Sequence, residues 1–492
     1  MRKFACSDAC KEVPMSSEIT MKSLEFQLKP KPGLAVLVVF LALWFCPPPQ
    51  GLTLQAWHVF VTFVCTILGF LTKPLPLGAI VMLALTVLAG TRTLTVPQTL
   101  SGFGNHSVWL IVMAFFISRG FAKTGLGRRI GYTFIKLLGN TTLGLAYAIG
   151  FTNYCLAPAM PSSTARSGGT VCPLTIAVAK AYGSDPATGT ERKIGSYLLF
   201  TAFQTNYPVG AAFMTAMAGN TLAASMAADL GVQITWLSWF IAALVPALVS
   251  ICSVPLALYV FYPPEIKKSP EAREMARQKL AEMGPMSLPE KMMLCAFIIL
   301  LSLWVFGTML GVHATIAAFV GIMFLVLVGV LTWKDVLSER GAYDCLIWFA
   351  GLIMMASYLN KLGVIKWITG GMSGMLAGLP WPVVIFVLAM SSMYLAYCFA
   401  SSTAMVSAVY AAYLTIALAN GVPPELGAMV IAIFINLQAC LTYYSGGSAP
   451  IFYSTGYIPS GDWLRVGFLV SLVHIVVWFG VGAIWWKIIG LY

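Results

Sequence analysis

The sequence predicts an all-α protein that crosses a membrane many times, and three observations support this fold class. Hydrophobic residues make up 59% of the 492 residues and charged residues only 9%, with a mean hydropathy of +0.85. A soluble domain carries about a quarter charged residues. Uncharged apolar runs repeatedly exceed the ~20 residues that a spanning helix needs. These runs are continuous rather than alternating, which favours helices over a β-barrel.

The apolar runs predict about 11 transmembrane helices and two re-entrant hairpins. The expected spans lie near 33–47, 55–73, 77–92, 107–122, 194–226, 234–262, 290–310, 313–332, 343–360, 424–456 and 463–488. Two further regions, 143–182 and 379–420, are interrupted in the middle by small polar residues. Their halves are about 15 residues long, which is too short to cross. We therefore expect each region to turn inside the membrane and leave by the side it entered.

The same tetrapeptide interrupts both regions. It reads Ser-Ser-Thr-Ala at 162–165 and again at 401–404. Gly125 and Gly363 are separated by the same distance to within one residue, in similar sequence surroundings. A constant offset of this kind indicates an internal repeat.

The basic residues favour one topology. With the N-terminus cytoplasmic, the main Lys/Arg clusters fall on the cytoplasmic side, as the positive-inside rule requires. These clusters lie at 29–31, 119–136, 192–193, 267–279 and 334–340. The second half then runs opposite to the first, so the repeat is inverted and the hairpins enter from opposite faces. One site built by two inverted halves is typical of secondary transporters.

The repeat divides the chain into four parts. Residues 1–32 form a polar cytoplasmic N-terminal segment. Residues 33–262 form the first repeat, with a cytoplasm-facing hairpin at 143–182 and a broken helix at 194–226. Residues 263–289 form a cytoplasmic loop, whose mixed charges are compatible with an amphipathic surface helix but favour a solvated connector. Residues 290–492 form the second repeat, with an outside-facing hairpin at 379–420 and a broken helix at 424–456.

Four segments are expected to form one binding site. They are the hairpin tips 161–169 and 400–404 and the helix breaks 204–211 and 441–450. Broken helices expose backbone N–H groups that attract anions, and Ser and Thr hydroxyls can donate to a carboxylate. The pattern therefore predicts a site for a small anion. Its candidate binding residues are Ser162, Ser163, Thr164, Asn206, Pro208, Ser401, Ser402, Thr403, Thr442 and Ser448.

Arg166 follows the first tetrapeptide, whereas Met405 holds the equivalent place in the second. One interpretation is that Arg166 orients a substrate carboxylate. The alternatives are that it reaches toward water in a vestibule or caps a helix.

The residue types that the predicted site lacks exclude several classes of function. Neither the hairpin tips nor the helix breaks contain Asp or Glu, which argues against an organic-cation site or a proton-coupled site. No nucleophile–base motif or metal-ligand cluster points to an enzyme, and no cofactor is predicted. Nucleic-acid binding would need a basic face on a soluble domain, and the sequence has none.

Three segments carry a family resemblance: PSSTARSGG at 161–169, FASSTA at 399–404 and LTYYSGGSA at 441–449. At these motifs the chain resembles the divalent anion:sodium symporter (DASS) family. It is most similar to the branch of 2-oxoglutarate/malate, citrate/succinate and tartrate/succinate translocators. The resemblance covers roughly residues 33–492.

The resemblance implies a homodimer in the cell inner membrane, with an elevator motion of the hairpin-bearing domain. It implies a dicarboxylate antiporter that exchanges 2-oxoglutarate or citrate against malate or succinate. A sodium-coupled dicarboxylate symporter and a sulfate permease remain the alternatives. Where the family carries Asn in its paired motifs, this chain carries Ser163 and Ser402. A sodium site near Ser163, Ser402 and Gly446 is therefore left open.

Overall fold

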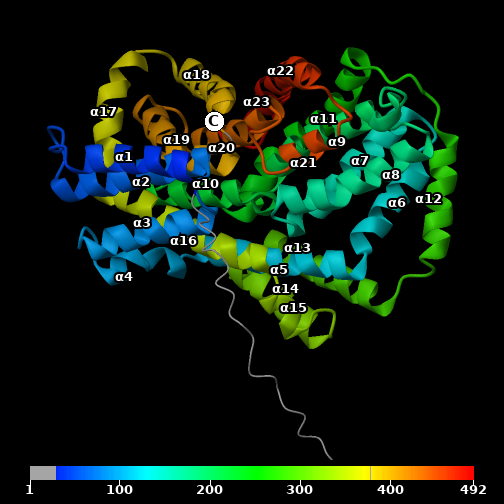
Figure 1. Ribbon diagram of the computed structural model, residues 1–492, viewed down its shortest axis with the longest axis horizontal. Helices are drawn as coiled ribbons and strands as arrows, with labels where there is room; N and C mark the ends of the chain where they lie inside the picture. Colours follow the sequence, from blue (N-terminus) through cyan, green and yellow to red (C-terminus); the bar gives the residue numbers. More distant parts are fainter. Residues whose placement is uncertain (1–28, 377, 400) are drawn as a thin grey trace, which may run out of the picture.

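The computed structural model describes residues 29–376, 378–399 and 401–492, and the side chains at 308, 369 and 371–375 are outside this description. Most of the predicted N-terminal segment (residues 1–28) and Ala400 of the second hairpin tip also lie outside the described residues. Within the described residues the regular structure is helical, apart from one isolated bridge between Thr141 and Lys268. Figure 1 shows the arrangement of the helices.

Eight described helices are long and apolar enough to span a membrane. Four shorter apolar helices accompany them. These helices confirm the predicted all-α, multi-pass class. Two of the eight spans by length are Trp381–Cys398 and Ser402–Ala419, the two legs of the second hairpin, so these legs are longer than the sequence suggested.

The helices of residues 54–261 and those of residues 288–476 follow one another in the same order in the two halves of the chain, with one additional helix before them. The first half comprises α1 (Pro30–Trp44), α2 (Leu54–Thr72), α3 (Leu77–Gly90), α4 (Val96–Thr99), α5 (His106–Thr124), α6 (Leu126–Leu138), α7 (Thr142–Leu156), α8 (Cys172–Ala181), α9 (Gly195–Ala212), α10 (Ala218–Asp229) and α11 (Trp236–Phe261). After α12 (Pro270–Glu282), the second half comprises α13 (Leu288–Leu310), α14 (Ala314–Leu327), α15 (Trp333–Leu337), α16 (Arg340–Lys361), α17 (Val364–Leu376), α18 (Trp381–Tyr394), α19 (Ser402–Ala419), α20 (Pro424–Leu437), α21 (Ala449–Ser454), α22 (Ser460–Val476) and α23 (Gly482–Ile488).

The equivalent helices α11 and α22 run antiparallel, as an inverted repeat requires. In the pair α11 and α22, Tyr262 OH donates to Asp462 Oδ2 at 3.0 Å at one end. At the other end, Trp486 Nε1 in α23 donates to the carbonyl of Ala242 at 2.9 Å. The packing is likewise swapped between the halves, because α5 packs against α14 and α16 packs against α3.

The paired glycines Gly125 and Gly363 hold the same structural place. Each follows a long helix, α5 or α16, and adopts a left-handed conformation with φ of 76° and 78°. Only glycine adopts this conformation readily, so it ends one helix and redirects the chain into the next. The next helices, α6 and α17, lead to the two hairpins.

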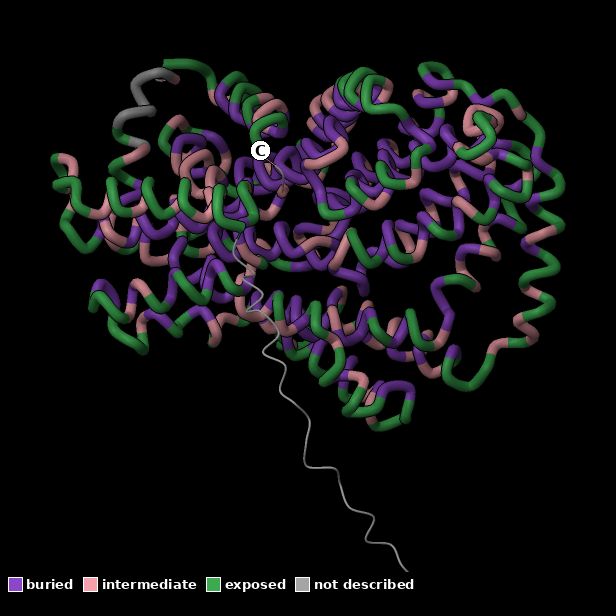
Figure 2. The backbone as a smooth tube through the Cα atoms, viewed as in Figure 1, coloured by how far each residue is buried: buried purple, intermediate pink, exposed green. Residues whose placement is uncertain are grey.

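The loop between the halves is more ordered than a solvated connector. Its α12 lies along one edge of the molecule and packs against α6 (Figure 1). Ala272 and Ala276 are buried in this contact, although α12 is otherwise mostly exposed or half-buried (Figure 2). The expectation of a plain connector is corrected here because two small apolar side chains give α12 a face to bury.

Candidate functional site

The first hairpin turns between α7 and α8. Ser162 lies near the start of its tip, and its Oγ accepts a hydrogen bond from the backbone N–H of Ala165 at 3.2 Å. A π-helix, Thr164–Val171, then leads into α8. π-Helical turns are rare and often lie at functional sites. Thr164 is exposed, and Ser163 is half-buried.

The second hairpin turns between α18 and α19. Ser401 Oγ accepts a hydrogen bond from the N–H of Ala404 at 3.3 Å and thereby caps α19. The first Ser of each tetrapeptide therefore caps the returning leg of its hairpin in the same way. Ser402 is buried and Thr403 is half-buried.

Arg166 is fully buried and uses its guanidinium group to hold the first tip together. Its Nε donates to Asn153 Oδ1 at 2.7 Å and its Nη2 to Asn206 Oδ1 at 3.2 Å. Its Nη1 donates to the carbonyls of Met160 at 2.7 Å and Ala216 at 2.8 Å. Four of its ~five N–H donors are thus engaged by neutral protein acceptors. In this structure Arg166 ties the hairpin tip to the first helix break.

The first helix break lies at 213–217, further along the chain than the expected 204–211. Pro208 sits inside α9, which continues to Ala212. The carbonyls released at the break find side-chain donors. Asn220 Nδ2 donates to Gly210 at 2.7 Å and to Phe213 at 3.0 Å, and Arg166 reaches Ala216. Side chains that satisfy the freed carbonyls, rather than the proline, therefore determine where the helix opens.

The second helix break lies between α20 and α21, at 441–448. Within it, Thr442 Oγ1 accepts from the N–H of Ser445 at 2.9 Å, and the two hydroxyls also bond to each other. Ser402 of the second tip donates to the Ser445 carbonyl at 3.2 Å. Gln438 Nε2 donates to Ser402 Oγ at 3.0 Å. Each hairpin tip is thus bonded to the break in its own half.

Contacts also join the two halves at this place, and two of them involve predicted binding residues. Asn206 Nδ2 in α9 donates to Ser448 Oγ in the second break at 3.3 Å. Thr164 Oγ1 of the first tip lies directly against Gly447, where a Cβ atom would collide with it. The structure thus brings Thr164, Asn206 and Ser448 to one junction, with Ser402 and Thr442 bonded into the same second break. No hydrogen bond among the described residues joins Ser163 to Ser402 or Gly446, so the sodium site stays a prediction.

Several polar residues at this junction were missed from the sequence. Asn153, Asn220 and Gln438 are buried amides in otherwise uncharged helices. Asn436 is also buried, and neither atom of its amide has a hydrogen-bond partner within the described part of the chain. Polar side chains inside apolar helices are costly and often functional, so their presence in these helices was an available signal. Among the described residues, no group of three or more His, Cys, Asp or Glu side chains could hold a metal ion.

Two cavities reach the hairpin tips. One, of about 500 Å³, includes Ser401 and Gly447 in its wall together with Lys29 and Lys73 near the α2–α3 turn. The other, of about 320 Å³, includes Gly169 of the first tip and Arg128 of α6. In the predicted topology both cavities open toward the face that carries the N-terminus.

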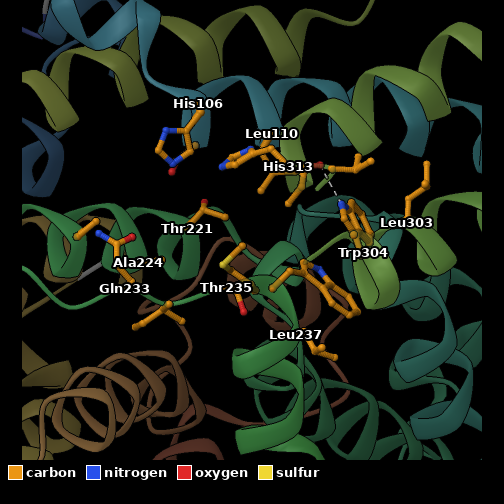
Figure 3. Close-up of a pocket in the computed structure, with 18 of the residues that line it drawn as sticks. His106, Leu110, Thr221, Ala224, Gln233, Thr235, Leu237, Leu303, Trp304 and His313 are labelled. Carbon is orange, nitrogen blue, oxygen red and sulfur yellow. Dashed lines mark hydrogen bonds between the residues drawn. The ribbon is translucent and has the colours of Figure 1, made fainter. Parts of the chain in front are cut away.

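A third cavity, of about 400 Å³, lies at the N-terminal end of α5 (Figure 3). His106 and His313 line it, with ring centroids 4.8 Å apart. None of the ten predicted binding residues lines this cavity. Met214 of the first helix break also lines it, so the cavity borders that break without containing a predicted binding residue.

Comparison with known proteins gives three findings. A family profile described as the sodium:sulfate symporter transmembrane region matches residues 30–492. YflS of Bacillus subtilis, named as a candidate malate transporter, is 49% identical over 462 residues, covering 94% of this chain and 97% of YflS. Dicarboxylate transporter 1, chloroplastic, of Spinacia oleracea is 46% identical over 465 residues, covering 94% of this chain and 82% of that protein.

A solved structure resembles the fold. The crystal structure of the Alcanivorax borkumensis YdaH transporter matches at a TM-score of 0.53 and 12% sequence identity. The match covers 88% of this chain and 99% of that one. At this identity the likeness concerns the fold alone.

Proposed function

Because the chain belongs to the sodium:sulfate symporter, or divalent anion:sodium symporter, family, we propose that it exchanges dicarboxylates or tricarboxylates across a membrane. The substrates we propose are 2-oxoglutarate or citrate, taken in exchange for malate or succinate. The observation that carries the proposal is the junction of two hairpin tips and two helix breaks, which offers hydroxyls and amides but no carboxylate. The family indicates a transporter rather than an enzyme.

The geometry supports recognition of an anion. The returning leg of each hairpin begins at the tip, so the positive end of its helix dipole lies beside the hydroxyls. Thr164 is exposed and Thr403 half-buried, so these hydroxyls are placed to donate to carboxylate oxygens. Relatives named for malate and dicarboxylate transport support this substrate class.

The assembly and motion follow from the same family. We propose a homodimer in the cell inner membrane with a cytoplasmic N-terminus. The hairpins and broken helices form a transport domain that slides as an elevator against a scaffold containing α2, α3, α13 and α14. The two cavities at the tips support an orientation in which the site is reached from the N-terminal face.

Counterflow in proteoliposomes tests the exchange. Vesicles loaded with unlabelled malate should take up labelled malate, 2-oxoglutarate, citrate or succinate much faster than empty vesicles. Equal rates into loaded and empty vesicles would contradict exchange. A conductance that needs no counter-substrate would instead indicate an anion channel.

A sodium-coupled symporter is the second candidate, favoured by the description of the matching family profile. It predicts uptake that requires sodium and does not require an internal carboxylate. Running the counterflow panel with sodium replaced by potassium, and with sulfate included, separates these functions.

A further inference from the structure

The cavity at the second hairpin tip has two walls of different character. One wall contains Ser401 and Gly447, which belong to the proposed binding site. The other contains Lys29, Lys73, Pro74 and Pro76, which lie just before α1 and in the turn between α2 and α3. The volume of about 500 Å³ is in the ordinary range for a small-molecule site.

The two lysines are the charged residues of this cavity. No acid is among the described residues that line it. Neither Lys29 nor Lys73 forms an ion pair within the part of the chain that the structure describes. An acid near the turn, Asp344 of α16, lies against Gly78 at the start of α3 and does not line the cavity. Among residues 29–376, 378–399 and 401–492, the cavity therefore presents positive charge to the hairpin tip with no acid in its wall to neutralise it.

The backbone holds Lys73 in an unusual conformation. Its φ is 50°, in the left-handed region that favours glycine or asparagine, and its N–H donates to the carbonyl of Gly69 at 2.8 Å. Pro74 and Pro76 follow it, and the N–H of Lys29 donates to the Pro74 carbonyl at 3.0 Å. A lysine kept in a position better suited to glycine suggests that its side chain has a use.

We propose that Lys73, with Lys29 beside it, forms a cationic subsite for the second carboxylate of a dicarboxylate held at the Ser401 tip. This inference rests on the proposed function and adds a specificity-determining contact from the other wall of the cavity. A dianion is favoured over a monoanion because only the dianion meets both the hydroxyl wall and the lysine wall. The lysines also raise the local concentration of anions at the cavity.

The test uses substitutions at Lys73 that suit its left-handed backbone conformation or keep its charge. Lys73→Asn removes the charge and suits the left-handed conformation, and Lys73→Arg keeps the charge. Lys29→Gln tests the second lysine without a turn constraint. Lys136→Gln, an exposed lysine of α6 that does not line this cavity, is the control.

The readout is the KM of malate counterflow at low ionic strength, measured from each side of the membrane. We expect Lys73→Asn to raise KM about threefold to tenfold on the side where this cavity opens. The KM on the other side, the maximal rate, and the KM values of Lys73→Arg and Lys136→Gln should stay near wild type. At ~1 M salt, where the Debye length is about 3 Å, the wild type should approach Lys73→Asn.

Three outcomes would overturn the subsite. Lys73→Asn and Lys29→Gln could both keep the wild-type KM while the wild type exchanges malate, or Lys136→Gln could raise KM equally. The effect could also vanish in vesicles without anionic lipid, which would assign the lysines to lipid headgroups. A wild type that exchanges no carboxylate would refute the proposed function itself, and this result is distinct from the other three.

Discussion

The two hairpin tips share a tetrapeptide but differ in how the protein holds them. At the first tip, Arg166 is buried and bonded to both the hairpin and the first break, and the chain continues as a π-helix. At the second tip, Met405 is buried among apolar groups and α19 is a regular helix. There, Ser402 makes the connection to the break through its hydroxyl. An inverted repeat can thus keep one cap and one hydroxyl motif while the two halves anchor it by different chemistry.

This difference suggests separate roles for neighbouring residues. The cap formed by Ser162 or Ser401 is common to both tips, so it belongs to the hairpin architecture. Arg166 occurs in one half only, so it belongs to the anchoring of that half. The hydroxyls of Thr164 and Thr403 take part in neither the caps nor the anchoring. We propose that they bind the substrate together with the Ser401 hydroxyl, which can donate while it accepts the capping hydrogen bond.

The largest expected effect is that of Arg166→Met, which gives the first tip the residue found in the second. It leaves two buried carbonyls and Asn153 Oδ1 without the Arg166 donor, and leaves Asn206 Oδ1 with only the long bond from Asn153 Nδ2. This loss should lower the free energy of unfolding by about 3 kcal/mol or more. Thermal melting followed by size-exclusion chromatography measures this loss. The control Arg128→Met changes an exposed arginine and should melt near wild type. A wild-type melting temperature for Arg166→Met would remove the anchoring role.

Thr164→Ala and Thr403→Ala should each abolish carboxylate uptake while the protein still folds, because each removes a hydroxyl donor to the substrate. Uptake into malate-loaded proteoliposomes, alongside melting temperature, checks both variants. If one variant retains wild-type uptake, that tip contributes only structure and the two tips differ in function as well as in anchoring.

Gly447→Ala should reduce uptake by about tenfold to a hundredfold, since the new methyl group meets Thr164 Oγ1 and shifts the first tip from the second break. Gly461→Ala is the matched control, because no heavy atom lies within 4 Å of a Cβ at that glycine. Equal uptake by the two alanine variants would show that the tip and the break need not touch.

Ser162→Ala and Ser401→Ala are expected to have the smallest effects, and these effects concern the stability of the protein. Each removes one N-terminal cap and should cost about 1 kcal/mol, with similar values at the two tips. Chemical denaturation or melting of the purified variants measures the pair. Clearly unequal losses would contradict the equivalence of the two caps.

The sequence predicted the all-α, multi-pass fold class and the family, because composition, apolar runs and a repeated motif all reflect large energy terms in a membrane. It misplaced the first helix break and assigned α12 to a connector. The position of the break depends partly on a partner distant in sequence, because Arg166 satisfies the carbonyl of Ala216, whereas Asn220 satisfies the nearby carbonyl of Phe213. The order of α12 depends on its packing against α6, which is also distant in sequence. Pro208 alone is a weaker determinant, since one lost N–H can be tolerated inside a well-packed helix.

The contacts of Arg166 do not test the hypothesis that it orients a substrate carboxylate. They do show that Arg166 anchors the first hairpin tip. The Arg166 side chain lies at the junction, as the sequence indicated, and most of its N–H groups donate to oxygen atoms of the protein. Such a network cannot be read from one sequence, because its acceptors are backbone carbonyls and amides from three separate segments.

Arg166 also has an electrical consequence. A guanidinium group keeps its charge, and its described hydrogen-bond acceptors are all neutral, so the proposed transport domain carries a fixed positive charge. Moving one charge through the membrane potential involves about 2.3 kcal/mol per 100 mV. Counting Arg166 and the substrate alone, an empty domain carries one positive charge and a dianion-loaded domain one negative charge, so the voltage acts on these charges in opposite directions. In a one-for-one exchange of dianions, the domain carries the same charge inward and outward. The net charge moved per cycle is then zero, and the membrane potential does not drive the exchange.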